Sequence, residues 1–375
     1  MAGNKQLGHA KATKNDEFYT EYSTISNEVG HYRDQFKGKI VYCNCDDPTW
    51  SNFWKYFHSN FASLGLKKLI ATHYAKDSQP SYAMIYEGGD DFNMDAGRTV
   101  EIIGNDDYTA GDFRSDACLK FLQECDICCT NPPFSLVALF LPMLAASGKN
   151  FLVLSPMTAL HYKEVFPLIK NNKAWLGYSY PKTFIQPDGS VKKFGNIFWC
   201  TNMDTNKRHN GLWHLNGKFD PSQAHQYYHG HESKYGTYYN FDGIDVSSID
   251  DIPIDYEGYM GVPDTIFDKY NPDEIEIIGM SADVPKKYVH KVAEAKTTIQ
   301  YVKADTGEVV WETPYTVKER KTGNGLRLQD ENGLPGKIPY SRIIIRNRHP
   351  LSKELDDDIA NGTITYDEAI NTERA

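Results

Sequence analysis

Apolar residues in the first part of the chain fall into short runs whose spacing alternates between that of strands and that of helices. Lys39–Cys45 is an apolar, β-rich run that stops at Asp46-Asp47-Pro48, which suits a turn or a helix start. Between Trp50 and Phe61 the aromatic residues follow helical spacing, and Lys67–Thr72 has the composition of a second strand. The pattern therefore predicts a strand, a turn, a helix and a further strand in succession.

The same alternation continues toward the middle of the chain. It predicts a hairpin of Tyr82–Tyr86 with Thr99–Gly104, helices over Asp116–Glu124 and Leu136–Ala146, and strands over Cys125–Thr130, Asn150–Ser155 and Phe194–Thr201. Alternating strands and helices favour an α/β fold with a largely parallel sheet covered on both faces. Such sheets bind ligands beyond the carboxyl ends of their strands, where Asp46, Asp112 and Asn131 fall.

The texture of the sequence changes after these elements. Tyrosine, glycine, asparagine and histidine dominate from Asn206 to Phe241 without a clear period, so we expect a domain boundary near residue 203. The expected parts are an α/β domain over residues 1–203, a mixed, β-rich α+β region over 204–350, and a short acidic tail over 351–375.

The composition is that of a globular protein, and the cysteine pattern indicates a reducing compartment. Hydrophobic residues make up 40% of the 375 positions, enough for a substantial core. The seven cysteines are odd in number and follow no regular framework. Met1–Gln6 has no apolar signal core, and Leu136–Ala146 is too short to span a bilayer. We therefore expect a cytoplasmic location and no membrane partner.

The spacing Cys125-x-x-Cys128, followed by Cys129, suits a tetrahedral zinc site. A second pair at similar spacing is missing, and the apolar setting around Ile127 points instead to a buried strand in which cysteine acts as a small hydrophobe. The second interpretation is favoured, so we expect no metal.

The net charge of -10 argues against a polyanionic partner, but it hides an uneven distribution. Between Lys286 and His349 basic residues outnumber acidic ones. The densest basic positions are Lys318, Arg320, Lys321, Arg342, Arg346 and Arg348. On charge alone, a nucleic-acid-binding surface and an ordinary solvated face remain equal alternatives.

The segment Thr130–Phe134 carries the parts needed to methylate an amine on a base. The lone pair of adenine N6 is delocalised into the ring, so a site has to localise it on the nitrogen before the amine can react. The side-chain oxygen of Asn131 and a backbone carbonyl from the stiff Pro132-Pro133 segment can accept the two amine hydrogens. Phe134 offers a face for a base taken out of the stack.

The alternative for this tetrapeptide is a turn closing a strand, with Phe134 simply packed in the core. Its context favours the active-site interpretation, because the segment follows an apolar strand and precedes an apolar helix. That is the position of an active-site loop in this architecture.

These residues resemble a known family, the EcoRI-type adenine-specific DNA methyltransferases. The resemblance extends beyond Thr130–Phe134 to Asn15–Thr20, Val41–Pro48, Gly111–Ser115, Phe166–Lys170, Trp175–Gly177, Tyr259–Pro263 and Asp268–Pro272. It covers most of residues 15–349, and the order of the blocks is more specific than any one of them. It implies a Rossmann-like S-adenosylmethionine-dependent methyltransferase sheet, followed by a C-terminal target-recognition region that binds double-stranded DNA.

The resemblance also implies roles for individual residues. Asn131, Pro132, Pro133 and Phe134 would be catalytic; Phe18, Tyr19, Thr20, Asp46, Asp47, Asp112 and Phe113 would bind S-adenosylmethionine; and Lys318, Arg320, Lys321, Arg342, Arg346 and Arg348 would bind DNA. It further implies a bacterial or phage-infected cell as the setting, and a cognate restriction endonuclease as a possible partner.

Two departures from the family pattern leave roles open. The glycines expected after Asp-Pro are replaced by Trp50-Ser51-Asn52, so which of Asp46 and Asp47 faces the ligand is undecided. An acidic residue for the cofactor ribose is not evident in Thr72-His73-Tyr74, and the substitutes nearby are Glu87, Asp90 and Asp91.

Two other functions remain as alternatives. Asn-Pro-Pro-aromatic loops also serve methyltransferases that act on RNA or on protein amides. A DNA-binding protein that keeps the scaffold without turnover is the second alternative, although Asn131 is intact.

Overall fold

A computed structural model describes residues 19–75, 80–185, 190–209, 217–220, 235–238, 241–282, 299–302, 309–312, 326, 328, 341–365 and 368. The chain divides into two compact units, residues 1–208 and 209–375, which are taken one at a time. Among the described residues, no helix has the length and apolarity needed to cross a membrane.

The first unit is built on an eight-stranded sheet in the order β5-β4-β3-β2-β6-β7-β11-β8. Along the chain the strands are β2 (Ile40–Cys43), β3 (Lys68–Thr72), β4 (Ser81–Tyr86), β5 (Arg98–Ile102), β6 (Ile127–Thr130), β7 (Asn150–Pro156), β8 (Trp175–Leu176) and β11 (Ile197–Thr201). Strands β3, β2, β6 and β7 pair in parallel, whereas β4 and β11 pair antiparallel to their neighbours. The predicted parallel sheet is thus present at the centre, but the whole sheet is mixed.

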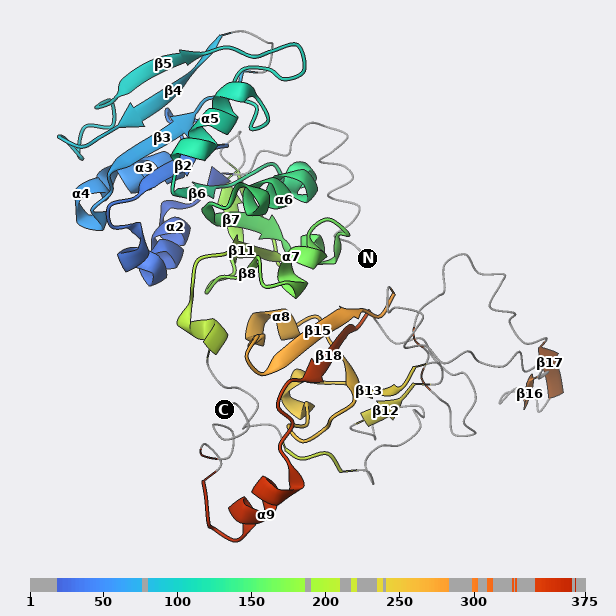
Figure 1. The fold of residues 1–375 in the computed structure, drawn as a ribbon. Helices are drawn as coiled ribbons and strands as arrows, with labels where there is room; N and C mark the ends of the chain where they lie inside the picture. Colours follow the sequence, from blue (N-terminus) through green and yellow to red (C-terminus); the bar gives the residue numbers. More distant parts are fainter. Residues whose placement is uncertain are drawn as a thin grey trace. The chain divides into compact units, whose positions relative to one another are not determined.

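Helices cover both faces of this sheet (Figure 1). One face carries α2 (Tyr22–Val29), α3 (Asn52–Ser59) and α4 (Phe61–Leu64), and the other carries α5 (Asp116–Glu124), α6 (Val137–Ser147) and α7 (Phe166–Lys170). The hydroxyls of Ser51 and Ser115 cap α3 and α5 by accepting hydrogen bonds from the backbone N–H groups of Phe53 and Cys118. Because β3 and β7 lie on opposite sides of the β2–β6 pair, right-handed crossovers place α3 and α6 on opposite faces.

The strand β6 shows why double coverage favours apolar sequence. All four of its residues are buried, as expected for a central strand covered on both faces. Cys125, Cys128 and Cys129 are fully buried, and burial raises the pKa of the Cys128 and Cys129 thiols well above their usual value. The thiols are therefore neutral and pack as small apolar groups. Within the described part of the chain, no group of three or more His, Cys, Asp or Glu side chains is arranged to hold a metal ion.

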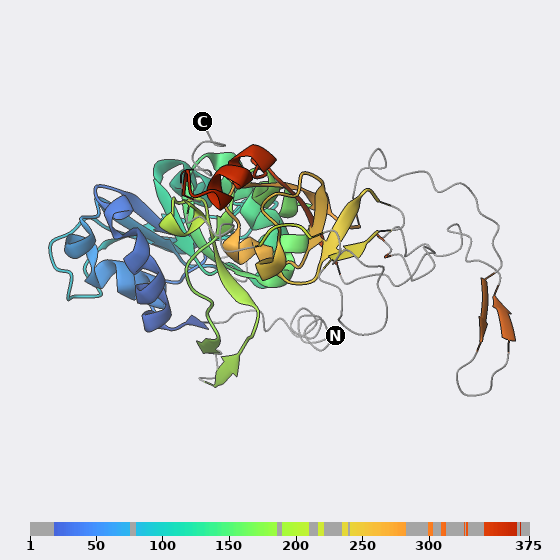
Figure 2. The ribbon, with the colours of Figure 1, turned by 90° about the horizontal axis from the view of Figure 1, so that it is seen from below.

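A small second sheet stands beside the main one, in the order β1-β9-β10. It consists of β1 (Tyr19–Thr20), β9 (Thr183–Ile185) and β10 (Val191–Lys193), all antiparallel. The β9–β10 hairpin projects from the unit in the view of Figure 2. This sheet was not predicted, because its strands are too short to show a period.

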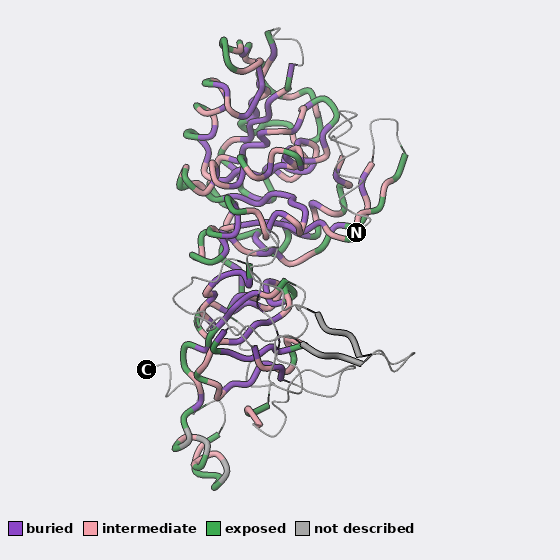
Figure 3. The backbone as a smooth tube through the Cα atoms, turned by 90° about the vertical axis from the view of Figure 1, so that its right-hand side faces the viewer, coloured by how far each residue is buried: buried purple, intermediate pink, exposed green. Residues whose placement is uncertain are grey.

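The second unit contains a five-stranded sheet in the order β12-β13-β14-β18-β15, consistent with the β-rich texture of the sequence. The strands are β12 (Tyr235–Thr237), β13 (Gly243–Val246), β14 (Tyr259–Val262), β15 (Ile275–Met280) and β18 (Ile343–Asn347). Helix α8 (Ile266–Lys269) follows β14, α9 (Lys353–Ala360) lies in the acidic tail, and β16 (Ile299–Val302) pairs with β17 (Val309–Glu312). Figure 3 shows buried segments running through the middle of each unit.

A buried ion pair connects strand β13 of the five-stranded sheet with Arg342, which directly precedes β18. Asp245 on β13 is 3% exposed and accepts hydrogen bonds from Arg342 Nε at 2.8 Å and Nη2 at 3.2 Å. The Tyr238 hydroxyl donates to the same carboxylate at 2.6 Å. The Arg342 guanidinium therefore forms its ion pair with a carboxylate of the same unit.

Candidate active site

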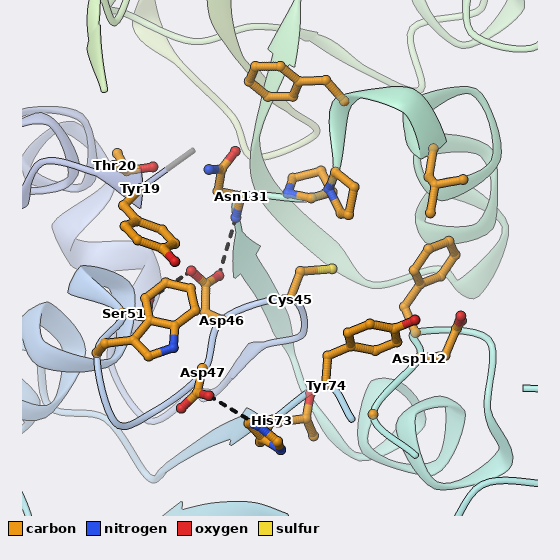
Figure 4. A pocket seen from close by; sticks show the side chains of 18 of the residues that line it. Tyr19, Thr20, Cys45, Asp46, Asp47, Ser51, His73, Tyr74, Asp112 and Asn131 are labelled. Atoms are coloured by element: carbon orange, nitrogen blue, oxygen red, sulfur yellow. Dashed lines mark hydrogen bonds and ion pairs between the residues drawn. The ribbon is translucent and has the colours of Figure 1, made fainter. Parts of the chain in front are cut away.

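A pocket of about 430 Å³ opens at the carboxyl ends of the central parallel strands (Figure 4). The chain leaves β2 toward β3 on one side, whereas β6 and β7 lie on the other, so the strand order reverses between β2 and β6. Open α/β sheets bind ligands at this switch point. Every predicted catalytic and cofactor residue that the structure describes lines the pocket: Tyr19, Thr20, Asp46, Asp47, Asp112, Phe113, Asn131, Pro132, Pro133 and Phe134. Phe18 lies outside the described residues.

The Asn131–Phe134 segment leaves the end of β6 as an extended loop. Asn131 is half-buried, and the two prolines hold the chain out of helix until a short 3-10 helix begins at Phe134. The Phe134 ring is 4% exposed and makes edge contacts with Phe184 at 6.3 Å and Phe194 at 6.4 Å between centroids. The loop therefore packs on two aromatic rings, Phe184 of β9 and Phe194, which follows β10.

The two aspartates after β2 face different partners (Figure 4). Asp46 points toward β6, and its carboxylate accepts a hydrogen bond from the Asn131 backbone N–H at 3.2 Å. Asp47 turns toward β3, with its Oδ2 3.5 Å from His73 Nε2, while its Oδ1 accepts from the backbone and hydroxyl of Thr49. The sequence did not distinguish Asp46 from Asp47, but in the structure their side chains point in different directions.

Asp112 is 9% exposed and is held by Arg114. The guanidinium donates to both carboxylate oxygens, from Nε at 2.9 Å and from Nη2 at 2.8 Å, in a bidentate pair. The Arg114 cation lies 4.5 Å from the centre of the Tyr108 ring and 5.3 Å from that of Phe113. Asp112 thus enters the pocket as part of a charged and aromatic cluster.

Gly111 lets this cluster approach β3. Its φ is +83°, and an added Cβ would collide with the backbone carbonyl oxygen of His73. A hydrogen bond from the Ala75 backbone N–H to the carbonyl of Ala110, at 2.8 Å, joins the same two segments. Backbone contact therefore closes this end of the pocket.

The N-terminal strand closes another side of the pocket. The ring of Tyr19 packs on that of Trp50, with 4.2 Å between centroids, and the Asn52 side chain donates to the backbone carbonyl of Thr20 at 2.7 Å. The Thr20 hydroxyl is buried and finds no hydrogen-bond partner among the described residues. Such a hydroxyl is suited to a polar group of a ligand.

Sequence reasoning missed several residues that line the pocket, among them Cys45, Trp50, His73, Tyr74 and Arg114. His73 is the best fixed of these. Its Nδ1 contacts the Ser81 hydroxyl, and its ring stacks on Tyr82 at 5.2 Å with an angle of 3° between the planes. The sequence signal was its place directly after a predicted strand.

The acidic residues named as substitutes for ribose binding do not line the pocket. Strand β4 runs antiparallel to β3, so residues after Tyr86 emerge at the opposite edge of the sheet. There Glu87 pairs with Lys68 at 3.2 Å, and Asp91 accepts hydrogen bonds from the Tyr86 hydroxyl and the Ala62 backbone. Glu87, Asp90 and Asp91 therefore belong to a different surface.

The basic residues predicted to bind DNA are in the second unit. Arg342 forms the buried pair with Asp245, whereas Arg346 and Arg348 are exposed on and after β18. Arg346 pairs with Glu276 at 2.7 Å, and Arg348 Nε donates to the Pro272 carbonyl at 2.8 Å. Lys318, Arg320 and Lys321 lie outside the described residues.

The sheet order and the pocket at its switch point define an α/β protein with a candidate ligand site between β2 and β6. Comparison with known proteins identifies the family. The family model described as "Adenine-specific methyltransferase EcoRI" matches residues 6–348. The chain therefore belongs to this family, which confirms the resemblance found in the sequence and the predicted enzyme class.

Three relatives illustrate the match. The type II methyltransferase M.EcoRI of Escherichia coli is 39% identical over 310 residues, which cover 76% of this chain and 92% of that protein. M.MpnI of Mycoplasma pneumoniae is 34% identical over 361 residues, covering 91% and 98%. M.MgeORF184P of Mycoplasma genitalium is 33% identical over 324 residues, covering 81% and 93%. No solved structure matches the chain.

Proposed function

We propose that this protein is a type II, site-specific DNA methyltransferase that transfers a methyl group from S-adenosylmethionine to adenine N6 in duplex DNA. The observation that carries the proposal is the convergence of Asn131–Phe134 with Tyr19, Asp47 and Asp112 on one pocket at the switch point of the sheet. Residues far apart in the sequence meet there. The 1–203 domain would be catalytic, and residues 204–350 would recognise the target DNA.

The pocket residues fit the proposed methyl donor. The volume of the pocket, about 430 Å³, lies within the range of small-molecule sites. Thr20 offers a buried hydroxyl without a protein partner among the described residues, and Asp47 offers a carboxylate to a cationic group. Asp112 and Phe113 would hold the purine, with Arg114 fixing the carboxylate. S-adenosylmethionine, when bound, supplies a methyl group already activated by its sulfonium.

The chain's own part in the reaction is to hold the acceptor. The Asn131 side-chain oxygen and the Pro132 carbonyl would accept the two hydrogens of the adenine amine, so that the nitrogen lone pair points at the donor. Phe134, braced by Phe184 and Phe194, would stack on the extruded base. Positioning of this kind provides the acceleration without a strong general base.

The experiment that tests this function follows the methyl group. Purified protein is incubated with labelled S-adenosylmethionine and DNA, RNA or a protein extract. The label incorporated into each substrate is counted, and the nucleosides of labelled nucleic acid are analysed by mass spectrometry. We expect N6-methyladenine in DNA alone, at a defined sequence. Label in RNA or in protein amides would assign the fold to another acceptor, and cofactor binding without transfer would indicate an inactive DNA-binding protein.

We further propose that Arg346 and Arg348 contact DNA phosphates, together with Lys318, Arg320 and Lys321. Both arginines are exposed, whereas the Arg342 charge is neutralised by Asp245. In the variant with Arg346→Gln and Arg348→Gln, DNA affinity should fall. The slope of log affinity against log salt should become shallower by about 0.9 for each phosphate that the variant no longer neutralises.

A matched control is Lys269→Gln, which removes a partly exposed cation of the same unit that pairs with Asp250 at 3.2 Å. The control should leave both affinity and salt slope near those of the unmodified protein. An unaltered slope in the double arginine variant would mean that this stretch is an ordinary solvated surface.

A further inference from the structure

One buried carboxylate joins the loop after β2 to the loop after β6. Asp46 is 5% exposed, and both of its oxygens accept hydrogen bonds. Oδ1 accepts from the Ser51 hydroxyl at 2.7 Å. Oδ2 accepts from the Thr130 hydroxyl and from the Asn131 backbone N–H. The carboxylate therefore holds the last residue of β6 and the first residue of the catalytic loop.

Thr130 completes a closed set of contacts between the two strand ends. Its hydroxyl oxygen accepts a hydrogen bond from the Cys45 backbone N–H at 2.9 Å while its proton is donated to Asp46. An ionised carboxylate is an acceptor only, so it matches the donors of Ser51, Thr130 and Asn131 that converge on it. Each polar group in the set has a partner, which gives the link a single arrangement.

We propose that Asp46 is a positioning residue: through Thr130 and the Asn131 backbone it fixes the loop that holds the target amine, while Asp47 is the carboxylate that faces the methyl donor. The inference rests on the proposed function, because that function has the Asn131 loop hold the target amine. It separates two neighbouring aspartates that the sequence leaves equivalent.

The direction of Asp47 supports this division. Asp47 is half-buried and lines the same pocket, but its contacts are with Thr49 and His73 rather than with β6. Figure 4 shows Asp46 turned toward Asn131 and Asp47 turned toward His73. A change at Asp47 therefore alters the donor side of the pocket without breaking the link to the catalytic loop.

The electrostatic surroundings keep Asp46 sensitive to protonation. Burial raises the pKa of Asp46 to about 6, against the opposing effect of its three hydrogen bonds. The other titratable groups facing it are the Asp47 carboxylate and the thiols of Cys43, Cys45 and Cys129. Burial raises the pKa of these thiols, so they stay neutral. A protonated Asp46 loses one acceptor, and the link to Thr130 and Asn131 weakens.

The test compares four variants of the full chain by steady-state methylation and by calorimetric titration with S-adenosylmethionine. Asp46→Asn and Thr130→Val should each lower kcat about 10- to 100-fold, the effect of losing a charged hydrogen bond, with the cofactor Kd nearly unchanged. Thr130→Ser keeps the hydroxyl and should restore most of kcat. Asp47→Asn should raise the cofactor Kd, and its loss of kcat at saturating cofactor should be smaller than that of Asp46→Asn.

Three further readouts separate positioning from general damage. The double variant Asp46→Asn with Thr130→Val should be no worse than either single variant, because both remove the same link. The kcat of the unmodified protein should fall as the pH drops through about 6, and this limb should disappear in Asp46→Asn. Thermal unfolding of each variant shows whether the fold is intact.

A raised cofactor Kd with normal kcat in Asp46→Asn would overturn the inference, as would additive losses in the double variant or failure of Thr130→Ser to restore kcat. These results are distinct from failure of the proposed function. If Asn131→Ala keeps normal turnover, the proposed function is wrong. If Asn131→Ala is inactive while Asp46→Asn and Thr130→Val are normal, only the positioning role is wrong.

Discussion

Replacing Asn131 with alanine should lower kcat for DNA methylation by about 100- to 1,000-fold, the cost of removing a preorganised hydrogen-bonding group from a reacting centre. The side chain stands at the end of β6, inside the pocket and ahead of two prolines that prevent the loop from rearranging to compensate. Because it acts on the acceptor, S-adenosylmethionine should bind with nearly unchanged Kd. Single-turnover methylation and calorimetry measure the two quantities separately.

Asn131→Asp is the informative companion variant. It keeps an acceptor oxygen, so its loss of kcat should be smaller, although the added charge stands near Asp46. Asn131→Ala with near-normal turnover at saturating cofactor and DNA would contradict the mechanism. An equal loss in both variants would show that the oxygen of residue 131 is not what the reaction uses.

Replacing Asp245 with alanine should destabilise the second unit by about 3 to 5 kcal/mol, the cost of leaving a buried cation without its partner. Asp245 is 3% exposed, and its loss removes the carboxylate that accepts hydrogen bonds from both the Arg342 guanidinium and the Tyr238 hydroxyl. The expected result is a lower denaturation midpoint for the second unit, followed by urea titration of the full chain.

The control for this variant comes from the same sheet. Arg346 on β18 pairs with Glu276, but the two side chains are 45% and 36% exposed. Glu276→Ala should therefore cost less than about 1 kcal/mol, as for other solvent-exposed pairs. Equal destabilisation by Asp245→Ala and Glu276→Ala would show that burial of the Asp245 pair has no special weight.

The elements predicted from periodicity match the structure where the spacing was regular. Asp116–Glu124 is helical over the predicted bounds, and the hairpin of residues 82–86 with 99–104 forms as β4 and β5. The sheet is more mixed than predicted, because the pairing direction of β4 and β11 depends on partners distant in sequence. Periodicity carries no information on such pairing.

The pocket was predicted in outline, but the partners within it were not. Asn131, Asp47 and Asp112 were expected to meet because the carboxyl ends of parallel strands share one edge. That Asp112 would be paired with Arg114, only two residues away, depends on the left-handed turn at Gly111 and on side-chain direction. Arg342 was grouped with exposed arginines, since its partner Asp245 is nearly a hundred residues away.

The close approach at Gly111 limits how this enzyme can change over evolutionary time. The pocket wall beside Asp112 is made of main chain against main chain, so no residue with a Cβ fits there without moving the loop from β3. Single substitutions can alter the neighbouring side chains, Phe113 and Arg114, and so adjust which donor or inhibitor is accepted. Diversification at this end of the pocket is therefore expected to run through the neighbours of Gly111, whereas position 111 is expected to stay glycine.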